Sequence, residues 1–379
     1  MSTSNIPDHL RKALAEREQK GMLRKLTSNF PTIDFCSNDY LGFSKLGLLK
    51  NKLETTSLIS ELSFGSAGSR LISGNSKFIE AAEKEIALFH HSESALIFNS
   101  GYDANLGLFS SVPQKDDLVL FDELIHASIY DGIKLGYAKH YKFKHNDVGS
   151  LNDLIQRHQH NFKAIYIAVE SVYSMDGDIA PLVEIIELIK GLENVFLIVD
   201  EAHAIGVFGK HGRGLCNELG IEKACFARVY TYGKAMGCHG AAIAGSDLLR
   251  NYLINFSRSF IYTTALPNHS VEAIVHAYQL LVETDQKGSL QTNIEHFNSK
   301  TSGIKNLIKS KSAIHSLVVG NNQKADLLEK QLAQNNIYVK AIKSPTVKEG
   351  TERLRFCLHA FNTKQEIDLL IESCQVFKT

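Results

Sequence analysis

The stretch NVFLIVDEAHA, residues 194–204, decides the fold of this chain. Residues 195–199 form an apolar run without alternating polar residues, which is typical of a strand buried on both faces of a parallel sheet. Asp200 and His203 follow the run directly. Because ligands of an open parallel sheet bind outside the carboxyl ends of its strands, this stretch predicts both a strand of such a sheet and functional side chains at its end.

Four further short runs rich in strand-forming residues are separated by helical segments and glycine-rich turns. They are residues 95–98, 118–121, 164–169 and 228–232. One intervening helix is expected at residues 77–90. Phe78, Ala82, Ile86 and Phe89 would lie on one face of this helix. The alternation predicts an α/β fold with a mainly parallel, doubly wound sheet over roughly residues 46–270.

The pattern changes after Pro267. A long helix is expected at residues 271–283, followed by a second set of strands and helices. The expected strands lie near 313–319, 337–342 and 353–358, and the expected helices at 323–335 and 363–376. We therefore expect three parts, which are an N-terminal helix and arm (1–45), a large domain (46–270) and a smaller C-terminal α/β domain (271–379).

The composition is that of an ordinary globular protein. Of the 379 residues, 44% are hydrophobic and 22% are charged, and 41 Lys and Arg residues balance 41 Asp and Glu residues. A net charge of zero gives no reason to expect a nucleic-acid or membrane-surface partner. Residues 1–21 lack the apolar region of a secretory signal, and the longest apolar runs are too short to span a bilayer. We expect a cytoplasmic protein.

Two features that resemble binding motifs carry little weight. The six cysteines form no C-x-x-C pair and no Cys/His cluster with zinc spacing, so no metal site is expected. Cys238 is expected to pack rather than to react. The stretch GSAGSRLISGNS, residues 65–76, lacks the Gly-Lys-Ser/Thr ending of a nucleotide P-loop, and its plain interpretation is a connecting loop.

Polar side chains that suit one kind of chemistry follow the predicted strands. Besides Asp200 and His203, they are His126, Glu170, Ser174, the turn at residues 100–102 and Lys234. If the strands share one sheet, these side chains lie along one edge. Lys234 stands among small residues in TYGKAMG, residues 231–237, where a dry environment would lower its pKa and make it a nucleophilic amine.

Pyridoxal phosphate is a cofactor whose needs this set matches. Its aldehyde bonds a lysine amine, and its ring nitrogen requires a carboxylate so that the ring acts as an electron sink. Its ring needs a flat partner, and its phosphate needs N–H groups and hydroxyls at a helix N-terminus. Lys234, Asp200, His126 and the turn at 100–102 fit these needs, with Thr231 as a further hydroxyl.

Taken singly, several of these residues also have a structural explanation. Asp200 could be a helix N-cap, His126 a loop histidine and Thr231 an ordinary strand residue. Asp176 and Asp178, in SMDGD, are expected to form a turn rather than to catalyse.

Nine segments occur in the order seen in the α-oxoamine synthases, a branch of the fold-type-I pyridoxal-phosphate enzymes, and the chain resembles this family over nearly its whole length. They are SNDYLGF (37–43), GSAGSRLISGN (65–75), NSGYDANLG (99–107), DELIHAS (122–128), ESVYSMDGDIAPL (170–182), VDEAHAIGVFGKHGRG (199–214), TYGKAMG (231–237), YTTALP (262–267) and GTERLRF (350–356). The resemblance implies a large domain with a mainly parallel sheet and a smaller C-terminal domain.

The resemblance also implies a role for each matching residue. Lys234 would bond the cofactor aldehyde, Asp200 would pair with the pyridine nitrogen, and His203 would hydrogen-bond the ring hydroxyl. His126 would stack on the ring and approach the substrate. Further cofactor contacts would come from Gly101, Tyr102, Glu170, Ser174, Thr231 and, across to the neighbouring subunit, Thr264.

Substrate contacts are implied in the same way. Arg355 and Asn38 would bind the amino-acid carboxylate, and Arg24 and Thr346 would contact the acyl substrate. Taken alone, Arg355 is a polar residue in an alternating strand pattern, and Arg24 fits a basic amphipathic helix. The family further implies a homodimer with shared active sites.

The stretch SPTVKEGTERLR, residues 344–355, resembles the family branch that condenses L-alanine with a pimeloyl thioester, carried by CoA or acyl carrier protein, with loss of CO2. Glycine acetyltransferase, 5-aminolevulinate synthase and serine palmitoyltransferase share the same acid–lysine core and stay open as alternatives. A non-catalytic partner subunit would be expected to lack the lysine. Tyr232, His239 and residues 359–362 depart from the usual pattern, which bears on the substrate rather than on the cofactor.

Overall fold

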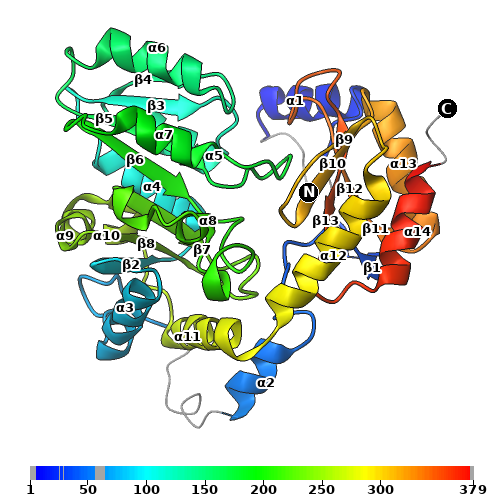
Figure 1. Ribbon diagram of the computed structural model, residues 1–379, viewed down its shortest axis with the longest axis horizontal. Helices are drawn as coiled ribbons and strands as arrows, with labels where there is room; N and C mark the ends of the chain where they lie inside the picture. Colours follow the sequence, from blue (N-terminus) through cyan, green and yellow to red (C-terminus); the bar gives the residue numbers. More distant parts are fainter. Residues whose placement is uncertain (1–5, 25, 29, 56–64, 376–379) are drawn as a thin grey trace.

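The computed structural model describes residues 6–24, 26–28, 30–55 and 65–375. Figure 1 shows two lobes, one built on a seven-stranded sheet and the other on a four-stranded sheet. We call these the large sheet and the small sheet. Helices cover both faces of the large sheet, and the predicted α/β class is confirmed.

The large sheet contains all five strands that were predicted in the middle of the chain. Its order is β2 (Ser94–Phe98), β8 (Ala241–Gly245), β7 (Ala227–Thr231), β6 (Val195–Asp200), β5 (Ile165–Glu170), β3 (Leu118–Asp122) and β4 (Lys139–Phe143). Strand β8 runs antiparallel to both of its neighbours, and the other pairs are parallel. The sheet is therefore mainly parallel, as predicted.

Burial on both faces of the sheet explains which of its strands could be predicted from the sequence. In β3, Leu118 and Leu120 pack into one core cluster and Val119 and Phe121 into the other, so no polar alternation interrupts the run. The edge strand β4 (KHYKF) is mostly exposed, and β8 (AAIAG) consists mainly of small residues with weak strand propensity. Neither of these two strands was predicted.

Helices connect the strands, and several begin at capping side chains such as Ser76, Ser100 and Ser246. They are α3 (Lys77–Phe89), α4 (Gly101–Ser111), α5 (Ala127–Leu135), α6 (Val148–His158), α7 (Leu182–Ile189), α8 (Leu215–Glu218), α9 (Asp247–Phe256) and α10 (Arg258–Ile261), with 3-10 turns at Lys210–Gly212 and Glu222–Ala224.

The four residues predicted to share one face of α3 all pack against the core. Ala82 and Ile86 are buried, and Phe78 and Phe89 are half-buried. The buried side of α3 also includes Glu83, whose carboxylate oxygens each lie 2.8 Å from an arginine, Arg70 or Arg250. A charged side chain that finds such partners can take a core position, which hydrophobic periodicity cannot indicate.

The small sheet is antiparallel throughout. Its order is β12 (Lys340–Ile342), β13 (Arg353–Cys357), β10 (Ile314–Val318) and β9 (Leu307–Ile308). The helices of this part of the chain are α11 (Asn268–Glu283), α12 (Gln286–Thr301), α13 (Asn322–Gln334) and α14 (Lys364–Gln375). The predicted strands and helices after Pro267 are present, and the polar helix α12 and the short strand β9 were missed. The division at about residue 270 remains a proposal.

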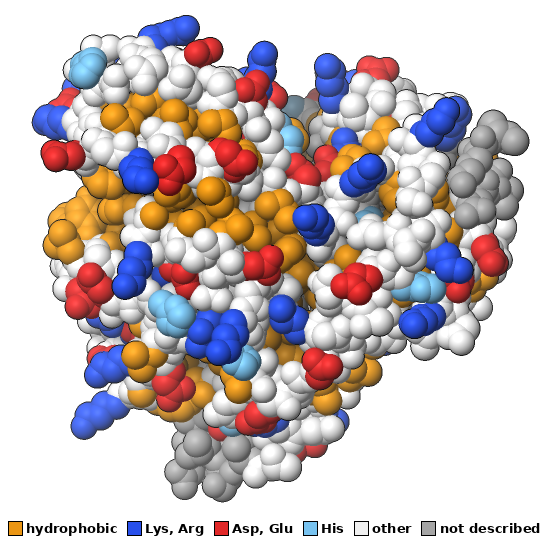
Figure 2. All heavy atoms as spheres, viewed as in Figure 1, with side chains coloured by type: hydrophobic (Ala, Val, Ile, Leu, Met, Phe, Trp, Pro, Cys, Tyr) orange, Lys and Arg blue, Asp and Glu red, His pale blue; other side chains and the backbone are white. Residues whose placement is uncertain are grey.

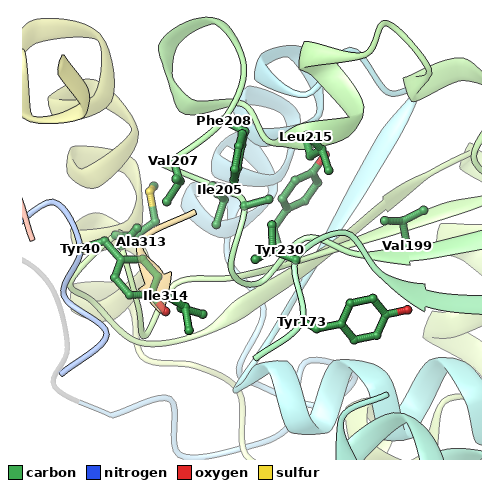
Figure 3. Close-up of a cluster of buried hydrophobic side chains, with 14 of the residues drawn as sticks. Tyr40, Tyr173, Val199, Ile205, Val207, Phe208, Leu215, Tyr230, Ala313 and Ile314 are labelled. Atoms are coloured by element: carbon green, nitrogen blue, oxygen red, sulfur yellow. The ribbon is translucent and has the colours of Figure 1, made fainter. Parts of the chain in front are cut away.

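The N-terminal part contains α1 (Asp8–Gln19) and α2 (Leu48–Thr55), and residues 33–44 between them contact the small sheet at Cys357 and the large lobe at Gly237. Strand β1 (Ile33–Asp34) pairs in parallel with β11 (Ile337–Tyr338). Figure 3 shows Tyr40 beside Ala313 and Ile314 at the small sheet, and the same core cluster continues to Tyr230 in the large sheet. This segment therefore joins the two lobes into one core.

The surface matches the balanced composition. On the face seen in Figure 2, acidic and basic side chains are interspersed. Among the residues described, no helix combines the length and the apolarity that a membrane span requires.

Candidate active site

The side chains predicted from the strand ends meet at the carboxyl edge of the large sheet. Asp200 ends β6, Glu170 ends β5, and the two residues lie opposite each other in the strand register. Lys234 follows β7, and its Nζ lies 2.8 Å from His203 Nε2. His126 caps the start of α5 and interacts electrostatically with both Asp200 and Lys234. One cluster therefore holds the predicted lysine, acid and histidines, with Asp200 and His203 buried, Lys234 half-buried and His126 exposed at its edge.

A tight loop between β7 and β8 holds Lys234. The Cys238 N–H donates to Tyr232 O at 3.1 Å, and the Gly237 N–H donates to Lys234 O at 2.9 Å. Gly237 has a φ of +63°, and a Cβ at this position would lie 2.8 Å from Ser44 N. The small residues around Lys234 thus make room for a distant backbone segment.

The protonation of Lys234 and His203 suits a reactive amine. Burial lowers the pKa of Lys234 to about 8, against the opposing effect of Asp200. Burial, and then the charge of Lys234, lower the pKa of His203 well below its usual value. A neutral His203 therefore faces a lysine whose amine is readily deprotonated, which is the form that attacks an aldehyde.

Two hydrogen bonds orient Asp200. The Ala202 N–H donates to Oδ1 at 2.9 Å, and Asn105 Nδ2 donates to Oδ2 at 2.7 Å. Asn105 Nδ2 also donates to Ser128 Oγ at 3.1 Å. Asn105 was not predicted, although it lies four residues after Gly101 in α4. That spacing places both residues on one helix face, and this is the signal that could have found it.

His126 is fixed in one neutral tautomer. Its Nδ1 accepts the Ser128 N–H at 3.2 Å and lies 2.7 Å from Ser128 Oγ. Because Nδ1 accepts a backbone N–H, the ring proton sits on Nε2. Burial lowers the pKa of His126, which keeps the ring neutral.

Glu170, the last residue of β5, lies beside Asp200 in this arrangement. Burial, and then the charge of Asp200, raise the pKa of Glu170 to about 8. The backbone N–H of His126 lowers the pKa of Glu170, but less strongly than the two effects that raise it. A protonated Glu170 avoids placing two like charges side by side in a buried site.

Helix α4 begins at the same edge and offers an anion site. Ser100 Oγ accepts the Asp103 N–H at 3.1 Å and caps the helix. A Cβ at Gly101 would lie 2.2 Å from Thr231 Oγ1, so glycine lets the turn approach this hydroxyl. Helix N-termini of this kind bind phosphate. Tyr102 is 44% exposed, and its hydroxyl donates to Asp131.

A chain of hydrogen bonds links the lysine to Arg355. Arg355 donates from a terminal guanidinium nitrogen to Asn38 Oδ1 at 3.0 Å. Tyr40 OH also donates to Asn38 Oδ1, at 3.1 Å, and lies 2.7 Å from His203 Nδ1. The chain runs through Lys234, His203, Tyr40, Asn38 and Arg355. Tyr40 was not among the predicted site residues.

The remaining predicted residues lie near the rim of this cluster or on the surface. Arg24 donates to Thr346 Oγ1 at 3.3 Å, so the structure brings this predicted pair together. The carbonyl of Ser174 accepts a hydrogen bond from Arg355 at 2.6 Å. Thr264 is exposed, and its carbonyl accepts from Asn99 at 2.8 Å.

Packing and hydrogen bonds surround Tyr232 and His359, which depart from the family pattern, and also Cys238. Tyr232 is fully buried, and its hydroxyl accepts from Tyr278 at 3.2 Å. His359 is buried between Ser37 and Asn362, with ring-nitrogen distances of 2.9 Å to Ser37 O and 3.0 Å to Asn362 Oδ1. Cys238 is half-buried and packs against the core, and burial raises the pKa of its thiol. Packing therefore accounts for Cys238.

These residues fit pyridoxal phosphate. A half-buried lysine with a lowered pKa, a carboxylate held by two donors, a neutral histidine and a capped helix N-terminus supply the four contacts that the cofactor needs. Within the described part of the chain, no group of three or more His, Cys, Asp or Glu residues is arranged to hold a metal ion. Fold and site together define a pyridoxal-phosphate-dependent enzyme of fold type I.

Comparison with known proteins places the chain within this class. Residues 31–373 match the family described as aminotransferase class I and II. An 8-amino-7-oxononanoate synthase from Emericella nidulans is 42% identical, with 97% of this chain and 95% of that protein covered. A second one, from Lysinibacillus sphaericus, is 35% identical over 96% of each chain. This chain belongs to the α-oxoamine synthases, the acyltransferase branch of that family.

Solved structures agree with this placement. A serine palmitoyltransferase from Sphingomonas wittichii superposes with a TM-score of 0.86 at 26% identity and covers 99% of this chain and 98% of its own. An 8-amino-7-oxononanoate synthase from Francisella tularensis superposes with a TM-score of 0.78 at 34% identity and covers 91% and 97%.

Proposed function

We propose that this protein condenses L-alanine with a pimeloyl thioester to give 8-amino-7-oxononanoate, CO2 and the free carrier, which is a step of biotin synthesis. The high identity to 8-amino-7-oxononanoate synthases over nearly the full length supports this choice. The observation that carries it is the hydrogen-bonded chain from Lys234 to Arg355, because it sets an amine and a carboxylate-binding guanidinium in one site.

The protein's own groups divide the work. Arg355 and Asn38 hold the carboxylate of the amino acid, as the planar guanidinium suits a carboxylate. Lys234 would hold the cofactor through its amine, and the free amine would take the Cα proton as general base. Asp200 would keep a proton on the cofactor ring nitrogen. Bound pyridoxal phosphate supplies an electron sink for the bonds broken at Cα.

The other predicted residues complete the proposal. His203 would hydrogen-bond the ring hydroxyl, and neutral His126 would stack on the ring. Further cofactor contacts come from Gly101, Tyr102, Glu170, Ser174, Thr231 and, in the adjacent subunit of a cytoplasmic homodimer, Thr264. Arg24 and Thr346 contact the acyl substrate, which CoA or acyl carrier protein delivers.

A matrix of substrates tests the proposal. Purified protein with pyridoxal phosphate is assayed with alanine, glycine and serine against acetyl-, succinyl-, pimeloyl- and palmitoyl-CoA and pimeloyl-acyl carrier protein. We expect the highest kcat/KM for alanine with a pimeloyl thioester. A preference for serine with palmitoyl-CoA, the substrates that the name of the similar serine palmitoyltransferase indicates, would keep the family and overturn this substrate assignment.

A further inference from the structure

Residues 174–177, between β5 and α7, contact the small sheet through three carbonyl groups. The Ser174 carbonyl accepts from Arg355 Nε at 2.6 Å, and the Met175 carbonyl accepts from Ser316 Oγ at 2.5 Å. The Gly177 carbonyl accepts from two hydroxyls, those of Ser310 at 2.8 Å and Ser312 at 3.0 Å. We call residues 174–177 the latch.

An ion pair completes the latch. Asp176 pairs with a terminal guanidinium nitrogen of Arg353, and the two side chains are only 14% and 10% exposed. At Gly177 the backbone has a φ of +71°, and a Cβ there would lie 2.2 Å from Ile314 O. The latch is therefore pressed against the backbone of β10 at a point where only glycine fits.

The base of the latch is fixed to the large sheet. The Tyr173 N–H donates to Asp178 O at 3.0 Å. The Asp178 carboxylate lies 2.6 Å from His145 Nε2, and the other ring nitrogen of His145 lies 2.9 Å from Asp122, at the end of β3. Burial alone would lower the pKa of His145, but the two carboxylates raise it to about 10, so the ring is charged at neutral pH.

A cavity of about 560 Å³ borders the end of the latch. Gly177 is the one latch residue in its lining, which also includes Asp178, Ile179 and residues at the end of α12 and around β9. The carbonyl hydrogen bonds and the Asp176–Arg353 pair connect residues 174–177 to the small sheet beside this space.

We propose that the latch positions Arg355, and that Asp176 and Arg353 are positioning residues for the reaction. Arg353 and Arg355 are two residues apart in β13, so their side chains point to the same face of the small sheet, and both bond the latch. The latch thereby sets the distance between Arg355 and the edge of the large sheet that carries Lys234. This inference rests on the proposed role of Arg355 as the carboxylate-binding group.

The test uses the pyridoxal-phosphate-loaded enzyme with Asp176→Asn, Arg353→Gln and the charge exchange Asp176→Arg/Arg353→Asp. Asp116→Asn is the matched control, because Asp116 pairs with Lys163 within the lobe of the large sheet. We expect each single variant to raise the KM for the amino acid about tenfold, with kcat within about threefold and the cofactor Kd within about twofold. The exchanged pair should recover most of the KM.

Two results would overturn the proposal. One is an unchanged KM in both single variants. The other is a parallel loss of kcat, cofactor affinity and thermal stability, without recovery in the exchanged pair, because that pattern describes general destabilisation rather than positioning.

Hydrogen exchange separates this inference from the proposed function. Asp176→Asn should speed amide exchange of residues 353–357 and 314–318 at least about threefold, whereas Asp116→Asn should leave it unchanged. This readout holds whichever amino acid is the substrate and even if none is turned over. Equal exchange in both variants would contradict the latch.

Discussion

Strands β6 and β13 each provide one charged group of the site, Asp200 and Arg355, and the two groups are held in position by different kinds of contact. Asp200 ends a mostly buried parallel strand, and its position comes from the sheet itself together with the Ala202 N–H and the Asn105 amide of α4. Arg355 lies in a small antiparallel sheet, and its partners Ser174 and Asn38 are 181 and 317 residues away. The cofactor side of the site is thus built within the large sheet and its helices, and the substrate side is assembled from segments of different parts of the chain.

This difference suggests a division between chemistry and specificity. Strand ends in a parallel sheet converge by geometry, so the groups for the cofactor are placed whenever the sheet forms. The position of Arg355 depends on contacts between lobes, which can change without disturbing the sheet. Variants on the two sides should therefore fail differently.

The largest effect is expected at the centre of the cofactor side. Lys234→Ala removes both the covalent anchor and the general base, and kcat/KM should fall by about a thousandfold or more. Steady-state kinetics and the visible absorbance of the bound cofactor measure this. Lys84→Ala, on the exposed face of α3, serves as control, and substantial activity in Lys234→Ala would contradict the assigned role.

A smaller loss of activity is expected at Asn105, which donates a hydrogen bond to Asp200. Asn105→Ala leaves Asp200 Oδ2 and Ser128 Oγ without their donor. A lost hydrogen bond to a charged group costs about 1.5–3 kcal/mol, so kcat and cofactor affinity should each fall about 10- to 100-fold. Cofactor titration and kinetics provide the two values. If Asn251→Ala, on the surface of α9, behaves the same, Asn105 has no specific role.

The substrate side is tested by Arg355→Lys. A lysine keeps the charge but loses the planar fork, so the KM for the amino acid should rise about 10- to 100-fold while the cofactor spectrum stays unchanged. Arg157→Lys, at the exposed end of α6, is the control. A loss of cofactor binding in Arg355→Lys would contradict the division of the site into a cofactor side and a substrate side.

The smallest effect concerns the stability of the small sheet. Burial lowers the pKa of His315, in β10, to about 3. The unfolded chain binds this proton from about pH 6.5 downwards, so the stabilising contribution is complete above that pH and is lost as pH falls toward 3.

Below pH 6 the loss should approach about 1.4 kcal/mol per pH unit, and His315→Phe should remove this contribution. Urea unfolding at pH 7.5 and pH 5.0 measures this, with the exposed His160→Ala as control. The same pH dependence in wild type and His315→Phe would refute the assignment.

The same contrast explains what could be predicted from the sequence. Lys234, Asp200, His126 and His203 were found because each follows a recognisable strand, and the strand order then brings them together. Asn105 was missed because its role depends on the face that α4 turns toward β6. No local pattern indicates that the latch bonds β10 and β13, and Asp176 had been interpreted only as a turn residue.

The most direct test of the central claim is to map the cofactor attachment site. The protein is incubated with pyridoxal phosphate, reduced with borohydride, digested and analysed by mass spectrometry. The account predicts one pyridoxyl-modified peptide, carrying the modification on Lys234, and none in Lys234→Ala. Stable modification of a different lysine, or no modification of a folded protein, would contradict it.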